Sequence, residues 1–220
     1  YLDYFGIEEA WTVIAFVRLG RGEEAKRQAE LMLDPEALNK DEVHHQYRNG
    51  LAGITASTVA MLTRDALWLA KIAPTLIECA RWTERVCEGT MHSANPSTRG
   101  LLPPHIYGGD LRDPATSLYS TVTCWRGLLE TSQAFRSLGS AKLMEEGERI
   151  AVVADRLRAQ IEKALSAVTD HSTTPPFVPL ALDIPSLDGR NEGPHEELTA
   201  TQFGNFWILF APMFLELDFR

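Results

Sequence analysis

An acidic side chain and an aromatic ring lie together in a glycine-rich stretch near the middle of the chain. Tyr107 and Asp110 are separated by two glycines, just ahead of a segment in which apolar residues recur at helical spacing. A carboxylate beside an aromatic ring, held by glycines where a helix begins, suits sugar binding and acid–base chemistry. No helix requires Asp110 as a cap, so its position favours a functional role.

The helix behind this stretch is predicted to start at Pro114. Asp113 has the side chain of an N-cap, and proline is well tolerated at the first helical position because its missing N–H costs nothing there. Leu118 and Val122 then begin an apolar pattern at helical spacing. We therefore expect a helix over residues 115–138.

The whole chain alternates between helices that are apolar nearly all round and helices that carry one apolar stripe. Each apolar helix is followed, after a short turn, by a charged partner. The predicted helices are 7–19 with 23–33, 49–62 with 66–88, and 115–138 with 141–165, followed by an apolar helix over 199–217. Pro74 lies inside the second charged helix and should kink it or mark its true start. No strand-like alternation of useful length is present.

This alternation predicts an all-α fold in two concentric layers. Helices that are apolar all round are buried, and helices with a single stripe cover them. Short turns lie within the pairs, while long connections over 34–48, 89–114 and 170–198 join one pair to the next. We expect one domain over residues 1–220 with about seven helices, forming part of an α/α toroid. A solenoid of the tetratricopeptide kind is the alternative, but its repeats have short, fixed periods.

In such a barrel, every long connection leads to the amino end of an inner helix, so all the connections open on one face. Long loops in compact domains are usually functional. Acidic, planar and amide side chains gather at these helix starts. The candidates for catalysis are Asp110, Glu8 and Glu196, and those for substrate binding are His45, Tyr47, Asn49, Tyr107, Trp125, Arg126 and Trp207.

Several of these residues have a structural interpretation as well. Glu8 and its neighbour Glu9 suit the positive end of a helix dipole. Trp125 and Trp207 suit a hydrophobic core, and Arg126 suits an ion pair with a carboxylate. The Glu196–Glu197 pair would also suit a solvated surface loop.

The composition of the chain disfavours some classes of binding partner. Its net charge of −9 disfavours nucleic acid, whose binding rests on Lys and Arg contacts to phosphates. A hydrophobic content of 45% is ample for a core, and no apolar run approaches the roughly 20 residues that span a bilayer. We expect no cofactor. Because the chain starts at Tyr1 with neither Met nor a signal peptide, we expect a processed protein or a piece of a longer one.

Cysteine and histidine spacing argues against a metal or redox site. Cys79 and Cys87 are two helical turns apart, roughly 12 Å, which is too far for a disulfide. With Cys124 they make an odd number of thiols, which favours packing roles. His44 and His45 diverge as neighbours on a helix start, and no third ligand is spaced for zinc.

Five motifs in this order resemble the six-hairpin glycosidase superfamily, which includes glycogen-debranching-like and glucosidase-like hydrolases. They are YFGIEEAW at 4–11, HHQYRNGL at 44–51, RGLLPPHIYGGD at 99–110, SLYSTVTCWRGL at 117–128 and GNFWILFAPMFLEL at 204–217. The resemblance implies an (α/α)₆ toroid that hydrolyses glycosidic bonds, usually with inversion. It makes Glu8 a better match than Glu9 to the acid of the first motif. A complete toroid has twelve helices, so further chain or a partner is expected to close the ring.

Glycoside hydrolysis by paired carboxyls is therefore the leading hypothesis for a carbohydrate substrate. The two groups lie about 5–5.5 Å apart in retaining enzymes and 6.5–9.5 Å apart in inverting ones. Asp110 is one candidate, and the sequence leaves Glu8 and Glu196 open for the other. The alternatives are a carbohydrate-binding fragment without turnover, a helical scaffold for proteins, and a sugar epimerase. The epimerase would use histidine bases chosen from His44, His45, His105 and His195.

Overall fold

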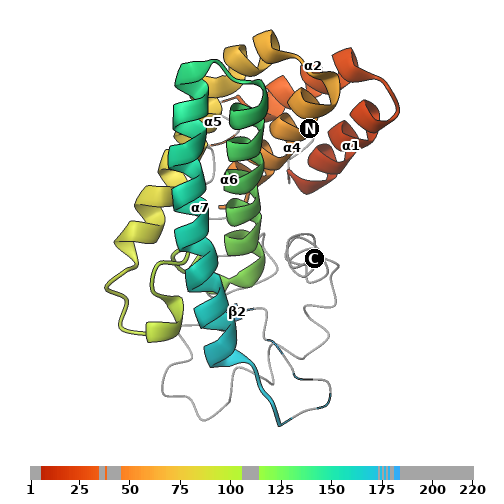
Figure 1. Ribbon diagram of the computed structural model, residues 1–220. Helices are drawn as coiled ribbons and strands as arrows, with labels where there is room; N and C mark the ends of the chain where they lie inside the picture. Colours follow the sequence, from red (N-terminus) through yellow and green to blue (C-terminus); the bar gives the residue numbers. More distant parts are fainter. Residues whose placement is uncertain are drawn as a thin grey trace.

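In the computed structural model, the described residues are 6–34, 38, 46–105, 114–172, 174, 176, 178 and 181–183. They form six α-helices, one short 3₁₀ turn and a two-stranded sheet (Figure 1), which confirms the expected all-α character. The helices, labelled as in Figure 1, are α1 (Ile7–Arg18), α2 (Gly22–Met32), α4 (Arg48–Thr63), α5 (Ala66–Gly89), α6 (Leu118–Leu138) and α7 (Ala141–Val168). Among these helices, none has the length and apolar character needed to cross a bilayer.

The helices pair into three hairpins that pack in chain order. α1 contacts α2, α4 contacts α5, and α6 runs beside α7 (Figure 1). Between hairpins, α1 packs on α4 and α4 packs on α6. The bounds agree with the predicted ones to within three residues at each end, because the apolar periodicity that marks them is local.

Burial separates these helices into two kinds. In α4 every residue from 49 to 57 is buried, and in α6 every residue from 118 to 125 is buried. α7 instead buries a single stripe that includes Ile150, Val153, Leu157 and Ile161. Their spacing of three and four residues is that of one helix face. The expected division into enclosed and covering helices is therefore present for these three.

Glycines allow α4 and α6 to pack with their backbones nearly touching. A Cβ atom added at Gly50 would lie 2.4 Å from the Thr123 carbonyl oxygen, and one at Gly53 would lie 2.7 Å from the Gly127 carbonyl oxygen. The contact on α6 moves from Thr123 to Gly127 as the contact on α4 moves from Gly50 to Gly53, so the two helices run parallel. Their amino ends consequently lie at the same end of the molecule.

A small sheet precedes α6 and corrects its predicted start. β1 (Thr116–Ser117) pairs antiparallel with β2 (Ala181–Asp183), so the backbone just after Pro114 is extended. The Ser117 hydroxyl accepts a hydrogen bond from the Ser120 N–H at 3.2 Å and caps the helix. The prediction that Asp113 caps a helix starting at Pro114 was wrong. The residues that would form its first turn, Thr116 and Ser117, pair with β2 as an extended strand instead.

Pro74 does not mark the start of α5. The helix begins at Ala66, where the Asp65 carboxylate accepts from the Trp68 N–H at 2.9 Å, and it continues past Pro74 to Gly89. The alternative of a later start is therefore wrong. The helix predicted over 199–217 lies outside the described residues.

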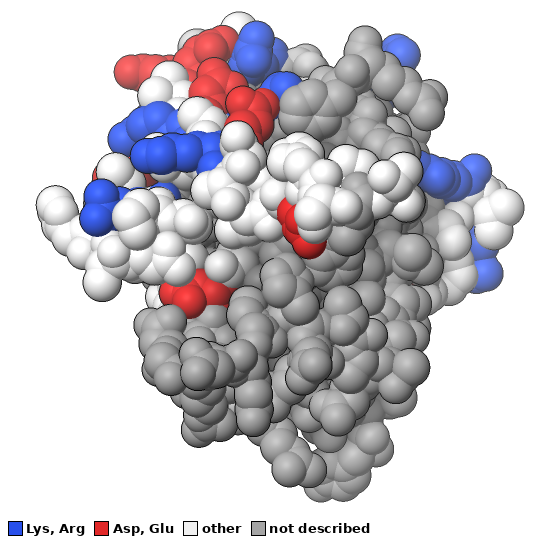
Figure 2. Space-filling view, turned by 90° about the horizontal axis from the view of Figure 1, so that it is seen from below, with Lys and Arg blue, Asp and Glu red and all other residues white. Residues whose placement is uncertain are grey.

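Charges of both signs are mixed on the surface. On the described part of the face shown in Figure 2, acidic and basic side chains lie side by side and form no extended basic patch. Ion pairs account for part of this mixture, as between Arg149 and Glu84 at 2.7 Å and between Lys71 and Glu30 at 2.7 Å. Whether nucleic acid is a partner stays a prediction from the net charge of −9.

Candidate functional site

The amino ends of α1, α4 and α6 meet at one place. Gly6, which precedes α1 with φ of 92°, packs on the first turn of α4, because an added Cβ would lie 3.4 Å from Arg48 Cγ and 3.5 Å from Leu51 Cδ1. Tyr47 caps α4, and its ring centroid lies 5.3 Å from that of Tyr119 in the first turn of α6. Three segments that are far apart in the sequence thus converge, as the sequence analysis expected of helix starts that share a face.

The two tyrosines form a tilted ring pair at this junction. Their planes meet at 59°, a geometry that aromatic rings favour. Burial raises the pKa of Tyr119 well above its ordinary value, with smaller contributions in the same direction from Tyr47 and from the charge of Glu8. The Tyr119 phenol therefore stays protonated in the folded protein over the physiological pH range, and Glu8 lies near enough to act on it.

Glu8 and Glu9 differ in what their carboxylates do. The Glu9 carboxylate accepts a hydrogen bond from the Gly6 N–H at 2.8 Å and so caps α1. The Glu8 side chain is exposed and has no hydrogen-bond partner within the part of the chain that the structure describes. Of the two acids, Glu8 is the one available to a ligand. Its catalytic role stays a prediction.

Two of the long connections are fixed next to the amino end of α6. His105 and Ala115 exchange backbone hydrogen bonds of 3.1 and 2.9 Å, so the segment that carries Asp110 leaves and returns at one place. β2 pairs with β1 directly before α6, and the segment that carries Glu196 follows β2 in the chain. The sequence did not predict this sheet.

Five of the ten candidates lie outside the described residues. They are His45, Tyr107, Asp110, Glu196 and Trp207. Their proposed roles, and the distance from Asp110 to either glutamate, stay predictions.

Besides Glu8 and Tyr47, three candidates are described, and all three lie on the enclosed helices α4 and α6. Trp125 is 2% exposed and belongs to the hydrophobic core, as the structural interpretation expected. The Arg126 guanidinium pairs with the Glu130 carboxylate one turn along α6, which confirms its expected ion pair. Asn49 is buried in the first turn of α4. The structure therefore gives Trp125 and Arg126 packing and pairing roles, while their contact with a substrate stays a prediction.

His105 is a buried residue of this region with a clear structural task. Its Nε2 lies 3.2 Å from the Ser120 hydroxyl, and its Nδ1 lies 3.4 Å from the Pro103 carbonyl oxygen. These contacts tie the strand-like segment at His105 to the first turn of α6. From the sequence, His105 was expected only as a possible base, and neither Tyr119 nor Ser120 was among the candidate site residues. Their place in the first turn of an enclosed helix was the available signal.

Metal and thiol chemistry find no support among the described residues. No group of three or more His, Cys, Asp or Glu side chains there is arranged to hold a metal ion. Cys79, Cys87 and Cys124 are free thiols, which confirms that no disulfide joins them. Burial raises the pKa of Cys79 to about 12 and that of Cys124 to about 12, so these thiols stay protonated and unreactive.

Comparisons of the chain with protein-family models, with curated proteins and with solved structures give no match.

Proposed function

We propose that this chain is a glycoside hydrolase or a segment of one, with its site at the amino ends of α1, α4 and α6. The observation that carries this proposal is the convergence of those ends, where the buried, tilted rings of Tyr47 and Tyr119 lie beside the exposed acid Glu8. Aromatic faces and carboxylates at one place suit a sugar ring, whose C–H faces are apolar and whose edges carry hydroxyls.

We also infer that the three hairpins are part of an (α/α)₆ toroid. The parallel packing of α4 on α6, with α1 next in line, supports this inference. So does the resemblance of the sequence motifs to the six-hairpin glycosidases. The remaining hairpins would come from further chain or from a partner.

The chemistry needs two carboxyl groups in different protonation states. One donates a proton to the leaving glycosidic oxygen, and the other, ionised, activates water in an inverting reaction or attacks the sugar in a retaining one. Asp110 is proposed as one of them and Glu8 or Glu196 as the other. The proposed sugar contacts are Tyr47, Tyr107, Trp125 and Trp207 through their rings and His45, Asn49 and Arg126 through hydroxyls.

The test is release of reducing ends from a panel of α- and β-linked oligosaccharides. Asp110→Asn should abolish release while leaving the circular dichroism spectrum unchanged. Glu8→Gln and Glu196→Gln should differ, with a loss of at least about 100-fold for whichever is the second carboxyl, as expected for a general acid or base.

Glu23→Gln is the matched control, because Glu23 is also an exposed acid in the first turn of a helix, α2. It should leave the rate unchanged. Sugar affinity without any release of reducing ends would instead support a carbohydrate-binding chain without turnover. Unchanged activity in Asp110→Asn would remove that residue from the mechanism.

A further inference from the structure

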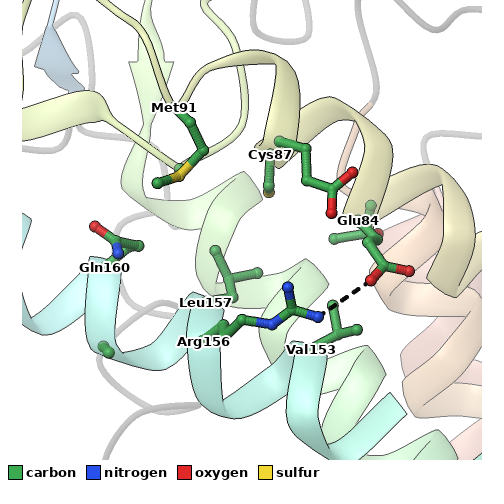
Figure 3. Close-up of a pocket in the computed structure, with 11 residues that line it drawn as sticks. Glu84, Cys87, Met91, Val153, Arg156, Leu157 and Gln160 are labelled. Carbon is green, nitrogen blue, oxygen red and sulfur yellow. Dashed lines mark hydrogen bonds and ion pairs between the residues drawn. The ribbon is translucent and has the colours of Figure 1, made fainter. Parts of the chain in front are cut away.

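A second concave site lies between α5 and α7 (Figure 3). Its cavity of about 380 Å³ is lined by these two helices and by the segment that follows α5. The volume falls in the range of sites for small molecules, about 300–1,000 Å³. None of the residues proposed for sugar chemistry lines it, so it is separate from the site at the helix starts.

Apolar side chains make most of its wall. Val153 and Leu157 come from α7, and Cys87 comes from α5 (Figure 3). Gly100 brings the following segment against α7, because a Cβ there would lie 2.9 Å from both Met91 Sδ and the Cγ of Gln160. With φ of 73°, Gly100 adopts a backbone conformation that other residues rarely do. Met91 thus lines this end of the cavity, which offers an apolar surface to a ligand.

The polar side chains that line the cavity occupy two successive turns of α5 and of α7. The Glu84 carboxylate accepts a hydrogen bond from Arg156 at 3.3 Å through one oxygen (Figure 3). Its other oxygen accepts from Arg149 at 2.7 Å. One turn further along α5 the lining residue is Glu88, and one turn further along α7 it is Gln160. The first position is thus a satisfied ion pair, while the lining residues at the second are an acid and a neutral amide.

Glu88 consequently carries a negative charge with no cation to match it. Its side chain is exposed, and it makes no ion pair within the described ranges. The neighbouring cation, Arg156, is engaged by Glu84. A ligand that brings its own cation would complete the second position.

We propose that this cavity binds a small organic amine, with its ammonium group at Glu88 and its apolar body on Val153 and Leu157. The Glu88 carboxylate accepts hydrogen bonds from the ammonium group and balances its charge. The net charge of −9 also attracts a cation in preference to an anion. This site does not depend on the function proposed above.

Three probes with the same chain and different head groups test the proposal: octylamine, octanol and octanoate. Isothermal titration at low ionic strength should rank their affinities in that order. Glu88→Gln should lower the affinity for octylamine by about fivefold, the upper end for an exposed ion pair, and leave that for octanol unchanged. Glu78→Gln removes an acid from the same helix outside the cavity and should change neither affinity.

Alkylation of Cys87 gives a second measurement. Cys87 lines the cavity and is partly exposed, while Cys79 and Cys124 are buried. Burial raises the pKa of Cys87 as well, so N-ethylmaleimide should label Cys87 slowly but ahead of the other two, as located by mass spectrometry. Octylamine should slow this labelling and octanoate should not. The proposal is overturned if octanoate binds as tightly as octylamine, if Glu88→Gln leaves octylamine binding unchanged, or if neither probe binds.

Discussion

Replacing Gly50 with alanine should force α4 and α6 apart. The added methyl group would lie 2.4 Å from the Thr123 carbonyl oxygen, where ordinary contact begins at 3.4 Å. The helix backbones must therefore separate by about 1 Å, because a carbonyl within a helix cannot turn away. Overpacking of this kind lowers the free energy of unfolding by about 1–3 kcal/mol. The better helix propensity of alanine offsets up to about 1 kcal/mol of this loss.

Chemical denaturation with urea measures the outcome. We expect Gly50→Ala to lower the free energy of unfolding by about 1–2 kcal/mol. Gly89→Ala is the matched control, since Gly89 also lies in a helix and an added Cβ there meets nothing within 4 Å. The control should be neutral or slightly stabilising.

Gly50→Ala should also change the packing of aromatic rings at the candidate site. Gly50 lies one turn from Tyr47, so separation of the helices there moves the Tyr47 ring from Tyr119. Near-ultraviolet circular dichroism, which reports on packed aromatic rings, should weaken in Gly50→Ala and not in Gly89→Ala. Equal stability of the two variants would refute the close approach of α4 and α6 on which the convergence of helix starts depends.

Three further predictions concern single interactions. Glu9→Ala removes the cap of α1 and should cost about 0.5–2 kcal/mol in urea denaturation; no loss would show that the cap is dispensable. The hydrogen bond from Lys26 lowers the pKa of Asp65, so stability from this pair is present above the unfolded pKa of about 3.9 and lost as pH falls below it. Unfolding at pH 7 and pH 3 should show a smaller difference in Asp65→Asn than in the unaltered chain, and an equal difference would contradict this assignment. Cys79 and Cys124, with pKa values near 12, should resist Ellman's reagent at pH 8 until urea unfolds the chain; rapid reaction of the folded protein would show that they are not enclosed.

The helices and their pairing could be predicted because the signals are local. A stripe of apolar residues at spacings of three and four, as in α7, shows in the sequence which face is buried. A run with only one polar residue, such as 51–56 with its single threonine, indicates that α4 is enclosed. The candidate site was predictable only as a set of helix starts, since no local signal shows which of them meet.

Local signals failed where a distant segment competes for the same backbone. Asp113 and Pro114 have the side chains of a helix start, yet the residues after them pair with β2, so that Thr116 lies opposite Asp183. The helix-dipole argument likewise does not distinguish Glu8 from Glu9, because both acids lie in the first turn of α1. Glu9 turns back to the Gly6 N–H, which leaves Glu8 exposed.

The sequence by itself determined an all-α chain of paired helices, their bounds, and the division into enclosed and covering faces, because each depends on residues within a few turns of one another. Only the tertiary structure decided that Tyr47 meets Tyr119, that α6 begins after a strand, and that a cavity with an unmatched acid lies between α5 and α7. Each of these features depends on which distant segments come together. For Tyr47 and Tyr119, the glycines at the contact of α4 and α6 set how closely the two helices approach.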